Sequence, residues 1–222
     1  MGKNIRLTAS DGHSFDAYKA VPAGTPKGGV VVIQEIFGVN SHIREVADSY
    51  AADGYLAVAP AVFDRQKASV ELGYTADDVT AGRTLKDSAS YEGAVLDLAA
   101  AVKAASEGGK VGTVGYCWGG TLSYLAATRV DGVAGSVVYY GGQIIPYKDE
   151  SAKAPLLMHF GEMDAGIPMD DVDTIKAAHP QADVHVYDAD HGFNCDHRSQ
   201  YDEESCKLAR RRSLAFFGQN VG

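Results

Sequence analysis

Continuous apolar runs and helically spaced apolar residues alternate along most of the chain. Short runs rich in valine, isoleucine and alanine are typical of strands that are buried on both faces of a parallel sheet. We predict such strands over residues 30–33, 55–59, 111–116, 133–140, 156–160 and 184–187. Before them, residues 5–9 and 15–20 alternate in period two around Asp11-Gly12, which predicts an antiparallel hairpin at one edge of the sheet.

The segments between these runs predict helices. Asn40 can cap a helix that Gly54 ends, and further helices are expected over residues 91–105, 170–178 and 203–217 and directly after residue 117. The expected buried faces are Ile43, Val46, Ala47, Tyr50 and Ala51 in the first helix, Val95, Leu98, Ala99 and Val102 in that of residues 91–105, and Cys206, Ala209, Ser213 and Phe216 in the last.

Residues 60–90 are polar and weakly periodic, so we interpret them as long loops with a short helix that extend away from the sheet and overhang the ligand-binding face. Elsewhere strands alternate with helices, which predicts an α/β fold: a mainly parallel sheet with right-handed crossovers and helices on both faces. Ligands bind such sheets outside the carboxyl ends of the strands. We expect a single domain over residues 1–222.

Composition narrows the possible partners. The chain of 222 residues is 45% hydrophobic, and its formal net charge of −9 disfavours nucleic acid and anionic membranes as partners. The one basic run, Arg210-Arg211-Arg212, is expected on the solvent side of the last helix. Small molecules are therefore the expected ligands, and we expect a monomer or a weak homodimer.

The chain begins without the apolar core of a signal peptide, and no apolar run approaches the length that spans a membrane. The cysteines Cys117, Cys195 and Cys206 form no regular disulfide framework and suit a reducing compartment. We expect a soluble, cytoplasmic protein.

Gly115-Tyr116-Cys117-Trp118-Gly119 joins an apolar strand to a helix and has the spacing of a nucleophile elbow, with a thiol in place of serine. Glycines two residues before and after the nucleophile avoid collisions at this sharp turn. The following helix directs its first N–H groups toward the sulfur and stabilises a thiolate. The alternative is that Cys117 is a small buried core residue.

An aspartate and a histidine follow in the order Cys117, Asp164, His191, which is the order of the α/β-hydrolase triad. In such a site the histidine holds the thiolate and protonates the leaving group, and the carboxylate orients the imidazole. Asp164 could instead be an exposed loop acid. Asp188 and Asp190 are rivals, but they lie too near His191 in sequence to face its ring easily.

Two backbone N–H groups are expected to bind the oxyanion: that of Trp118, after the nucleophile, and that of Ile36, after the first central strand. Glu35 has two interpretations. It is a strand-end acid near a helix N-terminus, or it competes with His191 for the thiol and keeps Cys117 neutral until a substrate arrives. Phe37, in the same loop, is a candidate substrate contact.

Together these segments resemble the dienelactone hydrolase (carboxymethylenebutenolidase) family, a branch of the α/β-hydrolases without a large cap domain. The resemblance runs through residues 34–38 (QEIFG), 115–120 (GYCWGG), 161–164 (GEMD) and 191–194 (HGFN). It implies Cys117, Asp164 and His191 as the triad, Glu35 as the active-site glutamate, and ring-opening hydrolysis of an enol-lactone through a thioester. It implies no metal and no organic cofactor.

One departure from the family pattern concerns the substrate. Members of the family bind the substrate carboxylate with two arginines, the second just past the histidine. Arg83 can supply the first, but Cys195 stands where the second is expected, and Arg198 is the nearest arginine. Because a thiol cannot grip a carboxylate as a guanidinium does, this departure leaves open whether the substrate is the dienelactone itself, and we expect an enol-lactone or an ester.

Three alternatives stay open. His191, Cys195 and His197 have residue types that suit zinc and would make a metal-binding module. A non-catalytic relative would bind a small ligand in the same pocket, and its Cys117 would be no more reactive than Cys195 or Cys206. An esterase, thioesterase or peptidase would share the fold and the nucleophile and differ only in the pocket walls.

Overall fold

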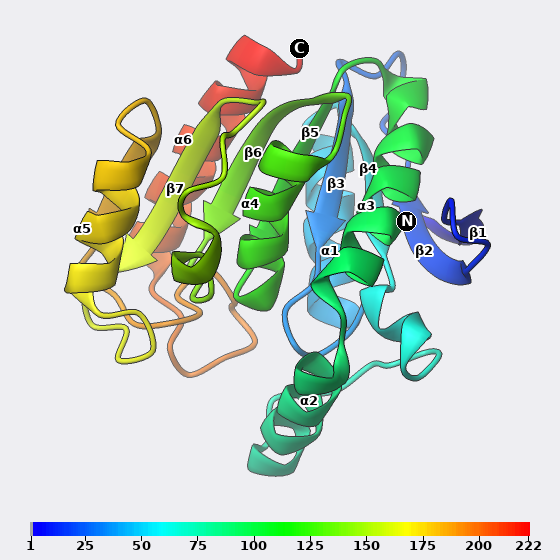
Figure 1. Ribbon diagram of the computed structural model, residues 1–222. Coiled ribbons are helices and arrows are strands. Elements are labelled where there is room, and N and C mark those ends of the chain that lie inside the picture. Colours follow the sequence, from blue (N-terminus) through cyan, green and yellow to red (C-terminus); the bar gives the residue numbers. More distant parts are fainter. Residues whose placement is uncertain (1) are drawn as a thin grey trace.

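Eight strands form one twisted sheet in the computed structural model, which describes residues 2–222 (Figure 1). The strands are β1 (Lys3–Thr8), β2 (Ser14–Ala20), β3 (Gly29–Ile33), β4 (Leu56–Pro60), β5 (Val111–Tyr116), β6 (Val133–Tyr139), β7 (Leu156–Gly161) and β8 (Asp183–Tyr187), in the spatial order β1-β2-β4-β3-β5-β6-β7-β8. The β1/β2 and β2/β4 pairs are antiparallel, and all the other pairs are parallel. The predicted hairpin therefore does form one edge.

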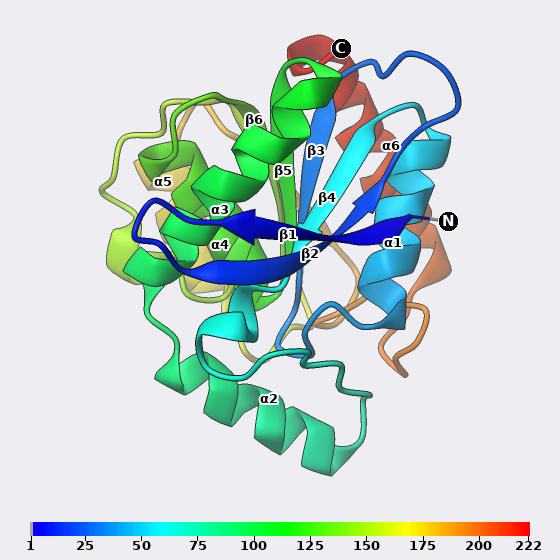
Figure 2. The ribbon, with the colours of Figure 1, turned by 90° about the vertical axis from the view of Figure 1, so that its right-hand side faces the viewer.

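Helices cover both faces of the sheet. Figure 2 shows α3 (Tyr91–Ala105), α4 (Trp118–Arg129) and α5 (Met169–Ala178) on one side and α1 (Ser41–Ala52) and α6 (Glu203–Asn220) on the other. Three 3₁₀ turns complete these elements: Val62–Arg65, Ser106–Gly108 and Ile145–Tyr147. The arrangement confirms the predicted α/β architecture. Of the helices in residues 2–222, none combines the length and the apolar character that crossing a membrane requires.

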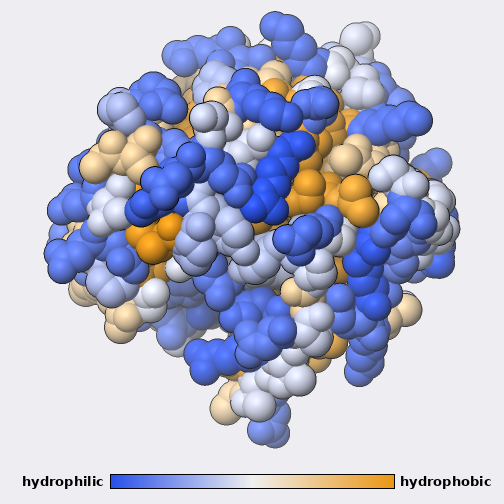
Figure 3. Space-filling model, viewed as in Figure 1, coloured by the Kyte–Doolittle hydropathy of each residue, from blue (hydrophilic) through white to orange (hydrophobic). Residues whose placement is uncertain are grey.

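The central strands are buried because both of their faces are covered. Every residue of β3, β4 and β5 is buried, as their continuous apolar runs predict. The outer surface on the side of α3 and α4 is mostly hydrophilic, with scattered hydrophobic patches (Figure 3). Large hydrophobic side chains that are exposed within residues 2–222 are Val21, Met163 and Tyr201.

Two helices bury slightly different faces from those predicted. In α3, Ala99 is exposed, and the buried face includes Asp97 instead. The Asp97 carboxylate accepts two hydrogen bonds from Arg65, both 2.8 Å long, and this partner permits its burial. In α6, Phe217 and not Phe216 is fully buried, because Phe217 packs against aromatic rings beside α1.

The basic run in α6 was also predicted wrongly in part, since only Arg211 is exposed. The guanidinium of Arg210 lies 3.5 Å from the centre of the Tyr50 ring and pairs with Asp53 at 2.6 Å. Arg212 donates a hydrogen bond to the Tyr187 hydroxyl. Arginine side chains can cover apolar surface in this way while their charge stays paired.

Residues 60–90 contain a longer helix than the short one predicted. Helix α2 (Ala76–Ser88) has 13 residues and begins with a capping box formed by Thr75 and Asp78. It lies beyond the carboxyl ends of the parallel strands, below the sheet in Figure 1. This segment therefore overhangs the ligand-binding edge, as predicted.

Candidate active site

Cys117 occupies a strained turn between β5 and α4. Its φ of +56° and ψ of −118° lie in a region that residues with a side chain rarely adopt. A Cβ atom at Gly115 would collide with the carbonyl oxygen of Gly119, and one at Gly119 would collide with the carbonyl oxygens of Ile33 and Gln34. The two glycines are therefore required by close backbone approach, and the predicted elbow is present.

His191 and Asp164, the other two predicted members of the triad, contact each other. Asp164 follows β7 and His191 follows β8, and the carboxylate Oδ2 lies 2.6 Å from His191 Nδ1. The Asp164 side chain is only 2% exposed and also accepts a 2.8 Å hydrogen bond from the Gly166 N–H. The rival Asp190 accepts from the backbone N–H of His191 and does not bind its ring.

Cys117 and His191 line one hollow of about 170 Å³. The cysteine is partly exposed, so the alternative of a buried core residue is wrong. Parallel strand ends, the loop after β3, helix α2 and the segment after β8 all contribute to its walls. The lining residues are Ile36, Phe37, Val79, Arg83, Lys86, Cys117, His191 and Arg198.

The environment of His191 favours its charged form. Burial alone would lower the pKa of His191, but the Cys117 sulfur and the Asp164 carboxylate outweigh it and raise the pKa to about 10. The arrangement therefore favours an imidazolium beside the Cys117 sulfur. In cysteine hydrolases, an imidazolium paired with a thiolate attacks acyl carbons.

The two expected oxyanion donors lie at the same edge. Trp118 is the first residue of α4, so its N–H has no acceptor within the helix. Its ring stacks on Phe63 with the centroids 5.0 Å apart, which anchors the start of the helix. Ile36 lies in the turn after β3 and lines the hollow.

Glu35 is a buried partner of Arg198. Its side chain is 2% exposed, and Oε1 accepts a 3.0 Å hydrogen bond from the Arg198 guanidinium. The other oxygen, Oε2, has no hydrogen-bond partner among residues 2–222. The structure therefore gives Glu35 an ion-pair partner, Arg198, that neither interpretation of the sequence included.

The sequence has no arginine directly after His191, but in the folded chain Arg198 lies in the same hollow as His191. Arg198 lines the hollow with Cys117, and its guanidinium also lies 5.9 Å from the centre of the Phe37 ring. Gly192 has a φ of +84°, and a Cβ atom there would lie 2.6 Å from Arg198 Nη1. The glycine directly after His191 therefore leaves the space that the guanidinium fills.

Arg83 reaches the hollow from α2, as predicted, and Lys86 lies beside it. With Arg198, three cationic side chains line one small hollow around a nucleophile. Such a surface can bind an anionic group of a ligand close to the sulfur.

The zinc set suggested by the sequence does not assemble. His191 is bound to Asp164, while Cys195 is fully buried with its thiol 3.4 Å from the Tyr74 hydroxyl. His197 lies instead against Glu45 of α1.

Comparison with known proteins agrees with this geometry. A family model described as "Dienelactone hydrolase family" matches residues 15–221. The chain is 38% identical to a "Putative carboxymethylenebutenolidase" of Synechocystis sp. over 85% of its own length and 84% of the relative's. It is 35% identical to the "Carboxymethylenebutenolidase" of Pseudomonas putida over 96% of its own length and 95% of the relative's.

Solved structures show the same fold. A putative dienelactone hydrolase from Klebsiella pneumoniae superposes with a TM-score of 0.84 at 32% identity, covering 98% of this chain and 99% of that one. An esterase from Pyrococcus furiosus shares the fold with a TM-score of 0.73 at 16% identity, covering 100% of this chain and 92% of the other. The predicted α/β-hydrolase fold is thereby confirmed.

Proposed function

This chain belongs to the dienelactone hydrolase family, whose members are hydrolases of esters and lactones, and on that premise we propose that it is a cysteine-dependent hydrolase that works through a thioester. One observation supports this most: a partly exposed Cys117 at a strained elbow shares a hollow with His191, whose ring is held by Asp164. The proposed substrate is an enol-lactone or another small ester.

In the proposed reaction the Cys117 thiolate attacks the carbonyl carbon and forms a C–S bond. The negative charge moves to the carbonyl oxygen, where the N–H groups of Ile36 and Trp118 bind it, each contributing on the order of 3 kcal/mol. Collapse of this intermediate breaks the C–O bond, and imidazolium His191 protonates the departing oxygen. For a lactone this step opens the ring and leaves it attached to the sulfur.

Water completes the cycle. Neutral His191 takes a proton from a water molecule, and the resulting hydroxide attacks the thioester carbon. The C–S bond breaks, the acid product leaves, and the thiolate and imidazolium are restored. Asp164 keeps the ring of His191 in the orientation that both proton transfers require.

We further propose that the substrate carries a carboxylate. The support is the group of cationic side chains of Arg83, Lys86 and Arg198, which line the hollow beside the nucleophile. In this proposal Glu35 positions Arg198 and partly offsets its charge, while Phe37 forms an apolar wall. The volume of about 170 Å³ favours a small molecule.

The central test compares Cys117→Ala with Cys206→Ala, which removes a second half-buried thiol away from the hollow. We expect Cys117→Ala to lose turnover of aryl esters and enol-lactones by at least about 10³-fold, and Cys206→Ala to keep it. Rapid acid quenching followed by mass spectrometry should find an acyl group on Cys117 only. Unchanged turnover in Cys117→Ala would end the proposal.

A non-catalytic binder predicts a different labelling pattern. If the pocket only binds a ligand, iodoacetamide should modify Cys117 no faster than Cys195 or Cys206. Ranking lactones, esters, thioesters and peptides by kcat/KM separates the esterase, thioesterase and peptidase alternatives, because these differ in the pocket walls and not in the nucleophile.

The carboxylate proposal has its own test in Arg83→Gln. With two esters that differ only in a free carboxylate or its methyl ester, we expect KM to rise by about tenfold for the first and to change little for the second. Equal changes for both esters would contradict a role in binding the carboxylate.

We also propose that the protein works in the cytoplasm, as a monomer or weak homodimer with small molecules as its ligands. The support is that its three thiols are free and that its net charge of −9 disfavours nucleic acid and anionic membranes. Light scattering at micromolar concentration tests the oligomeric state.

A further inference from the structure

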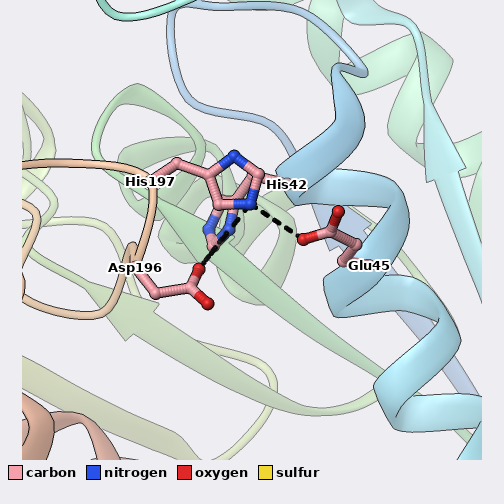
Figure 4. Close-up of side chains that lie close together, drawn as sticks. All are labelled: His42, Glu45, Asp196 and His197. Carbon is pink, nitrogen blue, oxygen red and sulfur yellow. Dashed lines mark hydrogen bonds and ion pairs between the residues drawn. The ribbon is translucent and has the colours of Figure 1, made fainter.

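Four side chains converge between α1 and the segment after β8, away from Cys117 (Figure 4). His42 and Glu45 belong to α1, and Asp196 and His197 belong to the segment after β8. We call these four residues the α1 cluster. One nitrogen or oxygen atom from each lies within 4.8 Å of the corresponding atoms of the others.

The distances show that the polar atoms face one another. His197 Nε2 lies 2.9 Å from Glu45 Oε2 and 3.9 Å from Asp196 Oδ1, and the same Asp196 oxygen lies 3.5 Å from His42 Nδ1. In Figure 4 the two rings overlap, with both carboxylates directed toward them. The ring centroids are 5.3 Å apart.

This spacing matches the donor set of a metal ion. Zinc binds imidazole nitrogen and carboxylate oxygen at about 2.0–2.2 Å, so neighbouring ligand atoms of a tetrahedral site lie roughly 3.3–3.6 Å apart. The 3.5 Å separation of Asp196 Oδ1 from His42 Nδ1 already lies in that range. The 2.9 and 3.9 Å separations at His197 Nε2 lie to either side of it, and the 60% and 62% exposed side chains of Glu45 and Asp196 can rotate to adjust them.

The rigid part of the α1 cluster is His42. Its side chain is 4% exposed, and its Nδ1 faces Asp196, while the other ring nitrogen, Nε2, has no hydrogen-bond partner within the part of the chain that the structure describes. A buried imidazole fixed on a helix is held in place before a ligand arrives, which reduces the entropy lost on binding.

An ion can reach the α1 cluster from solvent. A hollow of about 310 Å³ borders three of its four residues, His42, Glu45 and Asp196, and is also lined by Asn194, Cys206 and Arg210 among others. This space also admits a water molecule as a further ligand.

We propose that His42, Glu45, Asp196 and His197 bind one divalent transition-metal ion, with Zn²⁺ as the best match, and that the ion fastens the segment after β8 to α1. Two imidazoles with two carboxylates favour zinc over Mg²⁺ or Ca²⁺, which prefer oxygen ligands throughout. The role is structural. The adjacent residue Arg198 pairs with Glu35 in the hydrolase site, so the ion also steadies that arginine.

The test uses chelator-treated, tag-free protein that carries Cys117→Ala, so that zinc cannot bind the thiol beside His191. Equilibrium dialysis against ZnSO₄ with elemental analysis should give one ion per chain. Thermal unfolding should shift upward with zinc concentration, as binding to the folded state requires. The spectrum of the Co²⁺-loaded protein reports whether the site is tetrahedral.

Two variants and one matched control decide the outcome. Glu45→Gln and His197→Asn should each weaken zinc binding by about tenfold or more. His185→Asn is the control, because His185 is also a half-buried histidine that pairs with a carboxylate, Asp183 at 3.0 Å, and it lies outside the α1 cluster. The proposal is overturned by less than one ion per chain at saturation, by unchanged affinity in both variants, or by an equal loss in His185→Asn.

Discussion

The buried pair of Glu35 and Arg198 lends itself to a quantitative prediction. Arg198→Met keeps an unbranched side chain but removes the charge that faces a carboxylate with only 2% exposure. Removing one partner of a buried ion pair costs about 3–5 kcal/mol of the free energy of unfolding, because the remaining charge is left without compensation. Arg198 is itself 16% exposed, so water can reach part of the site, and we expect a loss of about 3 kcal/mol.

For a chain of this length, each kcal/mol shifts the melting temperature by about 2–4 °C, so Arg198→Met should melt about 6–12 °C below the wild type. Urea unfolding followed by circular dichroism measures the free energy directly. Lys153→Met is the control: it breaks a pair with Asp131 whose side chains are 53% and 93% exposed, and it should cost less than about 1 kcal/mol.

The double variant Glu35→Met/Arg198→Met distinguishes the stability lost through poorer packing from the stability lost by leaving the buried Glu35 charge unpaired. Replacing both members of a buried pair by apolar side chains is often close to neutral, so the double variant should be more stable than Arg198→Met alone by at least about 2 kcal/mol. The reasoning is refuted if the double variant is no more stable than Arg198→Met. It is also refuted if Arg198→Met costs no more than Lys153→Met.

Three further predictions concern the elbow, the triad and helix α1. Asp164→Asn should lower the pKa of His191 from about 10, which NMR titration of the imidazole measures. The raised pKa of His191 stabilises the fold below pH 6.5, and this contribution is lost as the pH rises toward 10. The variant should therefore lose more stability near about pH 6 than near about pH 10. An unchanged pKa of His191 would contradict the argument. Gly119→Ala should lower the free energy of unfolding by several kcal/mol or prevent folding, because the added Cβ meets backbone oxygens. Its control, Gly218→Ala, has open space in α6 and should raise the free energy of thermal unfolding by about 0.5–1 kcal/mol. Equal stability of the two variants would exclude close approach at the elbow. Asn40→Ala should cost about 1–2 kcal/mol in urea unfolding, because the side chain caps α1 and also donates to the Leu72 carbonyl; a loss below about 0.3 kcal/mol would show that the cap is not needed.

Local sequence patterns determined the elements and the elbow. A strand covered on both faces must be apolar throughout, so β3, β4 and β5 could be recognised from composition alone. The elbow could be recognised because it requires glycine at a fixed spacing, two residues before and two residues after Cys117, although the carbonyl oxygens that Gly119 approaches belong to Ile33 and Gln34. Chain order alone also indicated Asp164 and His191, because the carboxyl ends of parallel strands share one edge of the sheet.

Which residues of a helix are buried depended on contacts with residues that are distant in the sequence. Asp97 is buried in α3 because Arg65, distant in sequence, donates two hydrogen bonds to it. A helical wheel treats a charged residue as exposed and therefore places the apolar stripe slightly wrongly. The same holds for Arg210, whose burial depends on the ring of Tyr50.

The position of Arg198 in the candidate site was decided by the tertiary structure. Arg198 meets Glu35 across 163 positions of sequence, and the space for its guanidinium exists because Gly192 has no side chain. The α1 cluster likewise joins residues of α1 to others more than 150 positions away. The spacing of residues in the sequence predicts contacts within one helix, strand or turn. Contacts between a helix and a loop distant in the sequence depend on how the helices and loops pack around the whole sheet.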